Sequence, residues 1–277
     1  MTSLTRRLPL GVTHPTASDR IRQSGMIAAT VIALGGAVYG SGLAGGRPIP
    51  RVAGGALGPD ATLVAPAGPA FAIWSVVYLG LAGYAIWQAL PSQAARRRQR
   101  AVGYWIIASL LLNAAWIVAV QAGLLALSVP IIGLLLVVLV VAFVRLRHEP
   151  GDTTADAVLL DGTVGLYLGW AMVATAADVA AWLQTAGFTG FGMPPEVWAM
   201  AVLAALAVVA CALAVWDRGR LAPALASAWG LVWIAVSRSA GGLPSAVVAV
   251  TALASAILVI MVAVAVRVAR GGRPRRS

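Results

Sequence analysis

The chain has 277 residues, of which 60% are hydrophobic and only 10% are charged, and its mean hydropathy is +0.89. Soluble domains carry about 25% charged residues, so this composition excludes a water-soluble globule and also intrinsic disorder. The single cysteine excludes a disulfide-stapled secreted scaffold, and the net charge of +11 reflects an excess of arginine in a chain without lysine. These arginines occur in short clusters between apolar runs, which indicates membrane topology and no nucleic-acid partner.

Eight stretches reach the length of about 20 mostly apolar residues that a membrane-spanning helix needs. They lie at residues 26–45, 69–90, 101–122, 125–144, 162–184, 196–216, 221–238 and 245–267. Glycine, proline and charged residues separate most of them, but only Gln121-Ala122-Gly123 separates the third from the fourth. The predicted fold class is an all-α integral membrane protein, a bundle of about eight transmembrane helices.

The placement of arginine predicts the orientation of these spans. With eight spans and the N-terminus inside, seventeen of the 20 arginines fall on the cytoplasmic side, and Arg47, Arg51 and Arg238 fall on the other. Merging the third and fourth spans would spoil this bias. Because basic loops stay in the cytoplasm, we expect a multi-pass protein of the bacterial cytoplasmic membrane with both termini inside.

The two ends of the chain lack apolar runs of spanning length. Residues 1–24 are predicted to be a disordered cytoplasmic tail, and residues 271–277 a basic C-terminal tail. Arg6-Arg7 faintly resembles a twin-arginine signal, but the first apolar run is longer than a usual signal-peptide core. We therefore interpret that run as an uncleaved span.

The fifth span carries the clearest set of residues that are unsuited to lipid. At helical spacing, Tyr167, Trp170, Ala174 and Asp178 share one face. A carboxylate at this depth costs about 2.5–3.5 kcal/mol unless it is partnered, hydrated or protonated. This face should therefore point into the bundle, either as the wall of a cavity or as a tight helix contact with a satisfied structural aspartate.

The second and third spans show related patterns. Trp74 and Tyr78 lie four residues apart in the second span, and Trp116 lies on one face of the third span with Asn113 at its edge. A buried asparagine can also simply join two helices, through a hydrogen bond of about 0.6–2 kcal/mol. The sequence leaves open whether Asn113 contacts a ligand or only another helix.

Glycine pairs at a spacing of four residues occur in the first and fifth spans. Gly36 with Gly40, and Gly165 with Gly169, would permit close helix approach. We interpret both pairs as packing within the bundle, although a homo-oligomer is compatible with the same pattern.

Several chemistries lack the residues they require. His14 and His148 lie outside the spans, so neither a metal nor a haem ligand pair nor a Ser-His-Asp triad can be placed there. There is no phosphate-binding loop and no dinucleotide glycine fingerprint. Asp152, Asp156 and Asp161 are interpreted as a solvated acidic loop. We therefore predict no catalytic residues, no metal and no required cofactor, and leave enzymatic activity open.

Three segments carry a family resemblance. Residues 69–78 (PAFAIWSVVY) resemble the second-helix motif of the TspO/translocator-protein family, the tryptophan-rich sensory proteins. Residues 112–116 (LNAAW) resemble its third-helix motif, and residues 167–182 (YLGWAMVATAADVAAW) resemble its fifth-helix motif. The chain departs from the family pattern at Leu166, where the family has proline, and at Asp178, where it has asparagine. The resemblance covers about residues 26–185 and is closest to a longer bacterial branch with additional C-terminal helices.

This resemblance implies a TspO-like five-helix bundle at residues 25–185 and three additional helices at residues 186–270. It implies a pocket for a flat hydrophobic ligand, a tetrapyrrole such as a porphyrin or a sterol-like molecule. The residues that would line or support the pocket are Trp74, Tyr78, Asn113, Trp116, Tyr167, Trp170, Ala174 and Asp178. The aromatic rings would stack on the ligand, while Asn113 and Asp178 would be its polar anchors.

The expected function is that of a membrane-embedded binding or sensory protein, a receptor. Its expected partners are a bound hydrophobic molecule such as a porphyrin and the lipid bilayer. Transport of a small molecule is the main alternative, because Asp178 could carry a proton, although the two halves show no clear repeat. Light-dependent porphyrin degradation is a lesser alternative, since no nucleophile–base pair is visible. The last alternative is a structural or assembly role through the helix faces that carry the glycine pairs.

Overall fold

The computed structural model describes residues 14–271, and within that range every regular element is helical. Among these residues, eight helices are long and apolar enough to cross a membrane, which confirms the predicted fold and the separation of the third and fourth spans. The helices of these spans are α1 (Ala17–Gly40), α2 (Ile73–Gln88), α4 (Arg97–Gln121), α5 (Leu125–His148), α6 (Thr163–Thr185), α7 (Pro195–Trp216), α8 (Leu221–Ala240) and α9 (Ala246–Gly271). The span of α2 begins at Gly68, because the turn before the helix continues directly into it. The short helix α3 (Pro91–Ala94) follows α2, and a π-helical turn (Asp156–Gly162) leads into α6.

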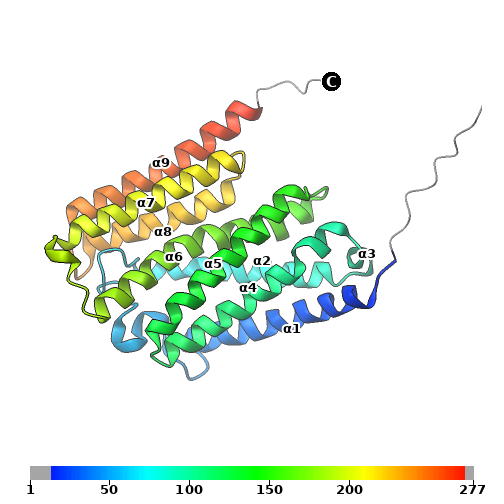
Figure 1. The fold of residues 1–277 in the computed structure, drawn as a ribbon, viewed down its shortest axis with the longest axis horizontal. Coiled ribbons are helices and arrows are strands. Elements are labelled where there is room, and N and C mark those ends of the chain that lie inside the picture. The colour runs from blue at the N-terminus through cyan, green and yellow to red at the C-terminus, as the bar shows by residue number, and fades with distance from the viewer. Residues whose placement is uncertain (1–13, 272–277) are drawn as a thin grey trace, which may run out of the picture.

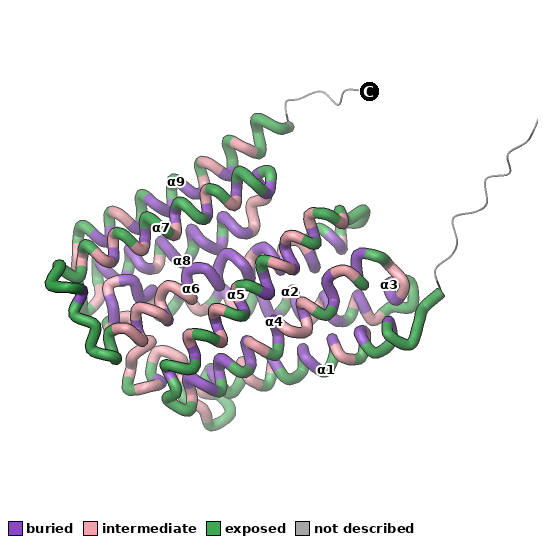
Figure 2. Tube along the Cα trace, viewed as in Figure 1, coloured by how far each residue is buried: buried purple, intermediate pink, exposed green. Residues whose placement is uncertain are grey.

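Helix α6 lies at the centre of the bundle (Figure 1). It packs against α5 and against α8, while α4 packs on α1 and α5, and α9 packs on α7 and α8. Buried residues follow α6 and α8, whereas the outer helices are largely exposed to the surrounding medium (Figure 2). In the most apolar stretch of each span, 61% of the residues are buried in the spans of α6 and α8, against 28% in those of α1 and α7. The molecule therefore has two parts, α1–α6 and α7–α9, joined along the contact between α6 and α8.

Successive spans alternate in direction, so the bundle has two ends of different composition. The arginine-rich end carries the start of α1, the end of α9 and the connections at residues 89–96, 149–155 and 217–220. The far end carries residues 41–72, 122–124, 186–194 and 241–245.

At the arginine-rich end, the acidic residues before α6 are paired with arginines of neighbouring segments. Asp156 is fully buried and pairs with Arg96 at 3.2 Å and with Arg98 at 3.2 Å. Asp161 pairs with Arg98 at 2.6 Å, and only Asp152 is largely exposed. The expectation of a solvated acidic loop was wrong for Asp156 and Asp161, because the start of α4 lies beside this segment.

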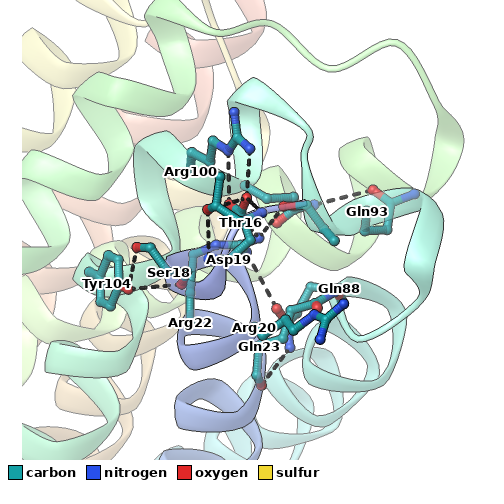
Figure 3. A network of polar contacts seen from close by, with 12 residues as sticks. Thr16, Ser18, Asp19, Arg20, Arg22, Gln23, Gln88, Gln93, Arg100 and Tyr104 are labelled. Atoms are coloured by element: carbon teal, nitrogen blue, oxygen red, sulfur yellow. Dashed lines mark hydrogen bonds and ion pairs between the residues drawn. The ribbon is translucent and has the colours of Figure 1, made fainter. Parts of the chain in front are cut away.

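The start of α1 is fixed by polar contacts shown in Figure 3. Thr16 and Asp19 form a capping box, and Asp19 accepts hydrogen bonds from Arg100 Nε at 2.8 Å and Arg100 Nη2 at 2.6 Å. Helix α1 therefore begins at Ala17, ahead of the predicted tail boundary at residue 24. Residues 1–13 and 272–277 of the two predicted tails lie outside the described residues.

Both glycine pairs are used for packing inside the bundle. A Cβ atom at Gly36 or Gly40 would touch α4, at Ala114 and Ile117 respectively. At Gly169 a Cβ atom would lie only 2.2 Å from the backbone oxygen of Pro223 in α8. The missing side chains therefore let α1 approach α4 and let α6 approach α8.

Candidate functional site

The segment before α2 brings two aromatic rings into the interior. Residues Gly68–Ala72 form a 3₁₀ turn, η3, which continues directly into α2. Two hydrogen bonds hold this segment against α8: Ala67 N–H donates to the Trp233 carbonyl at 3.1 Å, and Trp229 Nε1 donates to the Ala70 carbonyl at 2.9 Å. The C-terminal helices therefore position one wall of the predicted site, a role that the sequence motifs alone did not indicate.

Five rings from η3, α2 and α6 form the aromatic cluster, which consists of Phe71, Trp74, Tyr78, Tyr167 and Trp170. Trp74 stacks on Tyr78 with 5.3 Å between ring centroids and meets Tyr167 edge-on at 5.4 Å. Phe71 meets Trp170 edge-on at 5.7 Å. Each such pair contributes about 0.5–1.5 kcal/mol beyond the burial of its area. The cluster is therefore a packed interior surface and no interfacial belt.

Two polar side chains lie beside the aromatic cluster, and both have partners within the protein. Asn113 Nδ2 donates to Tyr78 Oη at 2.6 Å. Asp178 accepts hydrogen bonds from Trp116 Nε1 at 3.3 Å and from Ser128 Oγ at 2.9 Å. Asp178 is buried, so the face that carries it points into the bundle as its spacing predicted. These contacts are also those expected of a satisfied structural aspartate.

A small cavity of about 20 Å³ lies between the aromatic cluster and these polar groups. Six of the eight predicted residues line it: Trp74, Asn113, Trp116, Tyr167, Trp170 and Ala174. The other two, Tyr78 and Asp178, hydrogen-bond to lining residues. The structure thus brings all eight residues together, but it leaves room for about one water molecule, far below the roughly 300–1,000 Å³ of ligand pockets.

One donor at this cavity is unused. Trp170 is 1% exposed, and its Nε1 atom has no hydrogen-bond partner among the described residues. A buried donor without a partner costs about 1–3 kcal/mol, so a guest with an acceptor atom would gain from reaching it. No three His, Cys, Asp or Glu side chains in the described part of the chain are placed to hold a metal ion. A cofactor here would therefore be held by ring faces and by the Trp170 donor.

Ser128 is a member of the site that the sequence did not reveal. It lies in the first turn of α5, is fully buried, and donates the shorter of the two hydrogen bonds to Asp178. It stands as an isolated serine in an apolar run, and such a residue usually satisfies itself through its own helix backbone. Its hydroxyl does also lie 2.8 Å from the Leu125 carbonyl, so the local pattern gave no separate signal.

A much larger cavity lies elsewhere, at the far end of the bundle between α6 and α7. Its volume is about 940 Å³, and none of the eight predicted residues lines it. Helix α6 contributes mainly small or aliphatic side chains to it, including Ala176, Val179 and Ala180. Such residues are equally common on lipid-facing surfaces, which explains why the sequence did not point to this space.

Comparison with known proteins supports the resemblance of the motifs. No curated protein and no solved structure matches the chain. A protein-family model described as TSPO-like protein matches residues 27–265, which continues past residue 185 through α7, α8 and most of α9. The three additional helices are therefore included in the family pattern. With its eight apolar spans, the chain is a multi-pass integral membrane protein that belongs to the TSPO-like protein family.

Proposed function

We propose that this protein binds a flat hydrophobic molecule of the porphyrin class at the aromatic cluster and acts as a membrane-embedded binding or sensory protein. The observation that carries the proposal is the convergence of eight predicted residues, from α2, α4 and α6, around one small cavity. Ring faces there would stack on the ligand, and Asn113, Asp178 and Trp170 Nε1 would orient its polar atoms.

Binding at this site requires the rings to move apart, because the small cavity holds only about 20 Å³. The segment best placed to move is η3, since Phe71 covers Trp170 through one edge-on contact. Two hydrogen bonds to α8 hold this segment, and each contributes about 0.5–1.5 kcal/mol. Displacing Phe71 would enlarge the cavity and turn the unused Trp170 donor toward the guest.

The route of entry follows from the orientation that we propose. Loops rich in arginine stay in the cytoplasm, so the arginine-rich end would face inward and the far end outward. Trp74 lies in the first turn of α2 at the far end, and Trp116 lies in the second half of α4. A ligand would therefore reach the aromatic cluster from the outer half of the membrane, past η3.

Titration of detergent-solubilised protein with protoporphyrin tests this proposal. Binding should be followed by the absorbance of the porphyrin itself, so that removing tryptophans does not alter the readout. We expect saturable binding to the wild type and a loss of at least about tenfold in affinity for Trp74→Ala/Trp170→Ala, because both stacking faces are removed.

Trp216→Ala is the matched control, because Trp216 lies at the arginine-rich end with Arg147 over its ring at 4.0 Å. This variant should bind porphyrin like the wild type. Unchanged affinity in the double variant would refute the site, and equal losses in the double variant and the control would show that the tryptophans act only on folding.

A further inference from the structure

The space between α6 and α7, which we call the α6–α7 cavity, has the size of a ligand site. Its volume of about 940 Å³ lies within the roughly 300–1,000 Å³ of small-molecule pockets. It exists because α7 packs mainly on α9 and makes few contacts with α6. Residues 186–194 cross from the end of α6 to the start of α7 at the far end (Figure 1). The cavity is therefore bounded mainly by these two helices and by the loops of the far end, and Leu136 of α5 also lines it.

The body of the α6–α7 cavity is apolar and reachable from the side of the bundle. The small side chains of Ala176 and Ala180 in α6 leave space for the cavity, and Val202 and Leu206 of α7 line it as well. Val209, another lining residue, is 53% exposed on the outer surface of α7. Since this surface contacts lipid in a membrane, a hydrophobic molecule dissolved in the bilayer could enter between the two helices.

The polar lining is concentrated at the far end, and it contains a single charged side chain, Glu196. Glu196 lies in the first turn of α7, where the helix dipole stabilises negative charge, and it is partly buried. Among the described residues it forms no ion pair within 4.0 Å. Thr62, also in the lining, is 8% exposed, and its hydroxyl has no hydrogen-bond partner among those residues. The cavity therefore offers an unpaired acid and an unused hydroxyl next to an apolar body.

Arg238 is a buried cation of the far end that is held by loop carbonyl groups, one of which belongs to the lining residue Leu243. Arg238 donates hydrogen bonds to the carbonyls of Leu243 and Pro59. Asp60 accepts one from the Gly242 N–H at 2.8 Å. Neither Arg238 nor Asp60 lines the α6–α7 cavity. Glu196 is thus the lining group that sets the sign of charge the cavity prefers.

We propose that the α6–α7 cavity binds an amphipathic organic cation, with its apolar body between α6 and α7 and its positive group beside Glu196. A carboxylate without a counter-charge attracts a cation and repels an anion. The preferred ligand is thus opposite in charge to a porphyrin carboxylate. This site lies on the other face of α6 from the aromatic cluster and does not depend on the function proposed for that cluster.

Tetraphenylphosphonium and tetraphenylborate provide a matched pair of probes, because they have nearly the same shape and opposite charge. Each labelled ion is equilibrated with the protein in phosphatidylcholine nanodiscs, and empty nanodiscs give the background. We expect saturable, protein-dependent binding of the cation only. Ala180→Trp should weaken it at least about tenfold by filling the cavity. Glu196→Gln, which keeps the shape, should weaken it about fivefold.

Ala204→Trp is the control, because Ala204 is an exposed α7 residue outside the lining, and it should bind the cation like the wild type. The aromatic-cluster variant Trp74→Ala/Trp170→Ala should also keep cation binding, which separates this proposal from the porphyrin site. Unchanged cation binding in Glu196→Gln, or equal saturable binding of the borate, would overturn the assignment of charge. Undiminished binding in a folded Ala180→Trp would overturn the location.

Discussion

The interiors of the two parts of this molecule are held together by different means. Inside α1–α6, buried polar side chains bond across helices, as Tyr84 does with Gln99 at 2.7 Å and Asn113 does with Tyr78 at 2.6 Å. Inside α7–α9, the buried residues are largely alanines; α7 alone contributes Ala199, Ala207, Ala210 and Ala214. Lipid is as apolar as these helices, so association in a membrane relies on hydrogen bonds or on close packing of small residues. The first part uses both, and the second relies mainly on packing.

This difference explains why the two faces of α6 are so unlike. The face toward α2 and α4 carries large rings and is filled to within about 20 Å³. The face toward α7 carries small side chains and borders about 940 Å³ of open space. Close packing of small residues stabilises only those helix pairs that are in direct contact. Helix α7 can therefore pack on α9 and leave part of α6 uncovered. One helix, α6, thus lines a nearly filled cavity with polar groups on one face and a large, mostly apolar cavity on the other.

The largest effect is expected where the two parts meet. In Gly169→Ala the new Cβ atom would lie 2.2 Å from the Pro223 oxygen, so α6 and α8 must separate. We expect unfolding in a denaturing-detergent titration to become easier by about 3 kcal/mol. Gly133→Ala is the control, because its Cβ atom meets nothing within 4 Å and should leave stability equal or slightly higher. Equal behaviour of the two variants would mean that the α6–α8 contact does not join the parts.

A smaller effect should follow from removing one hydrogen bond inside the first part. Tyr84→Phe deletes the donor to Gln99 Oε1 and leaves this buried oxygen without that partner. We expect a loss of about 1–2 kcal/mol in the same titration. Tyr104→Phe makes the same chemical change at a residue that is 48% exposed, and its loss should be below about 0.5 kcal/mol. If both variants lose the same amount, buried polar contacts do not hold the first part together.

The smallest effect concerns a buried charge of the second part, the carboxylate of Asp217 in the turn between α7 and α8. Burial raises the pKa of Asp217 to about 6, while hydrogen bonds from the Gly219 and Arg220 N–H groups oppose the shift. The folded protein thus binds this proton more readily than the unfolded chain. Its free energy of unfolding, relative to Asp217→Asn, should fall by about 1 kcal/mol as the pH rises from about 5 to about 6. A difference that stays constant across this range would contradict the expected titration.

The motifs predicted which residues lie together at the candidate site, but they did not predict how small its cavity is. Helical spacing placed Trp170 and Asp178 on one inward face, and the structure brings both to the small cavity or its hydrogen bonds. The spacing did not identify Ser128, because periodicity within one helix says nothing about which residue of another helix lies opposite. The same limit applies to the wall formed by η3, which depends on Trp229 and Trp233 of α8.

The charged residues give a similar contrast. The arginine counts favoured eight spans, with the third and fourth kept separate, and the described residues contain eight. They did not predict that Arg98 pairs with Asp156 and Asp161, which lie far from it in the chain. A count of arginines gives the sign of the net charge of a loop, whereas an ion pair depends on the distance between two segments.

By itself, the sequence determined the class of fold, the number of spans and the face of each central helix that avoids lipid. These properties depend on length, hydropathy and helical period, which are local along the chain. Only the tertiary structure decided that the ring-lined face encloses almost no space and that the plain aliphatic face of α6 borders a large cavity. The volume between helices depends on how side chains from different segments interlock, and no single segment encodes that.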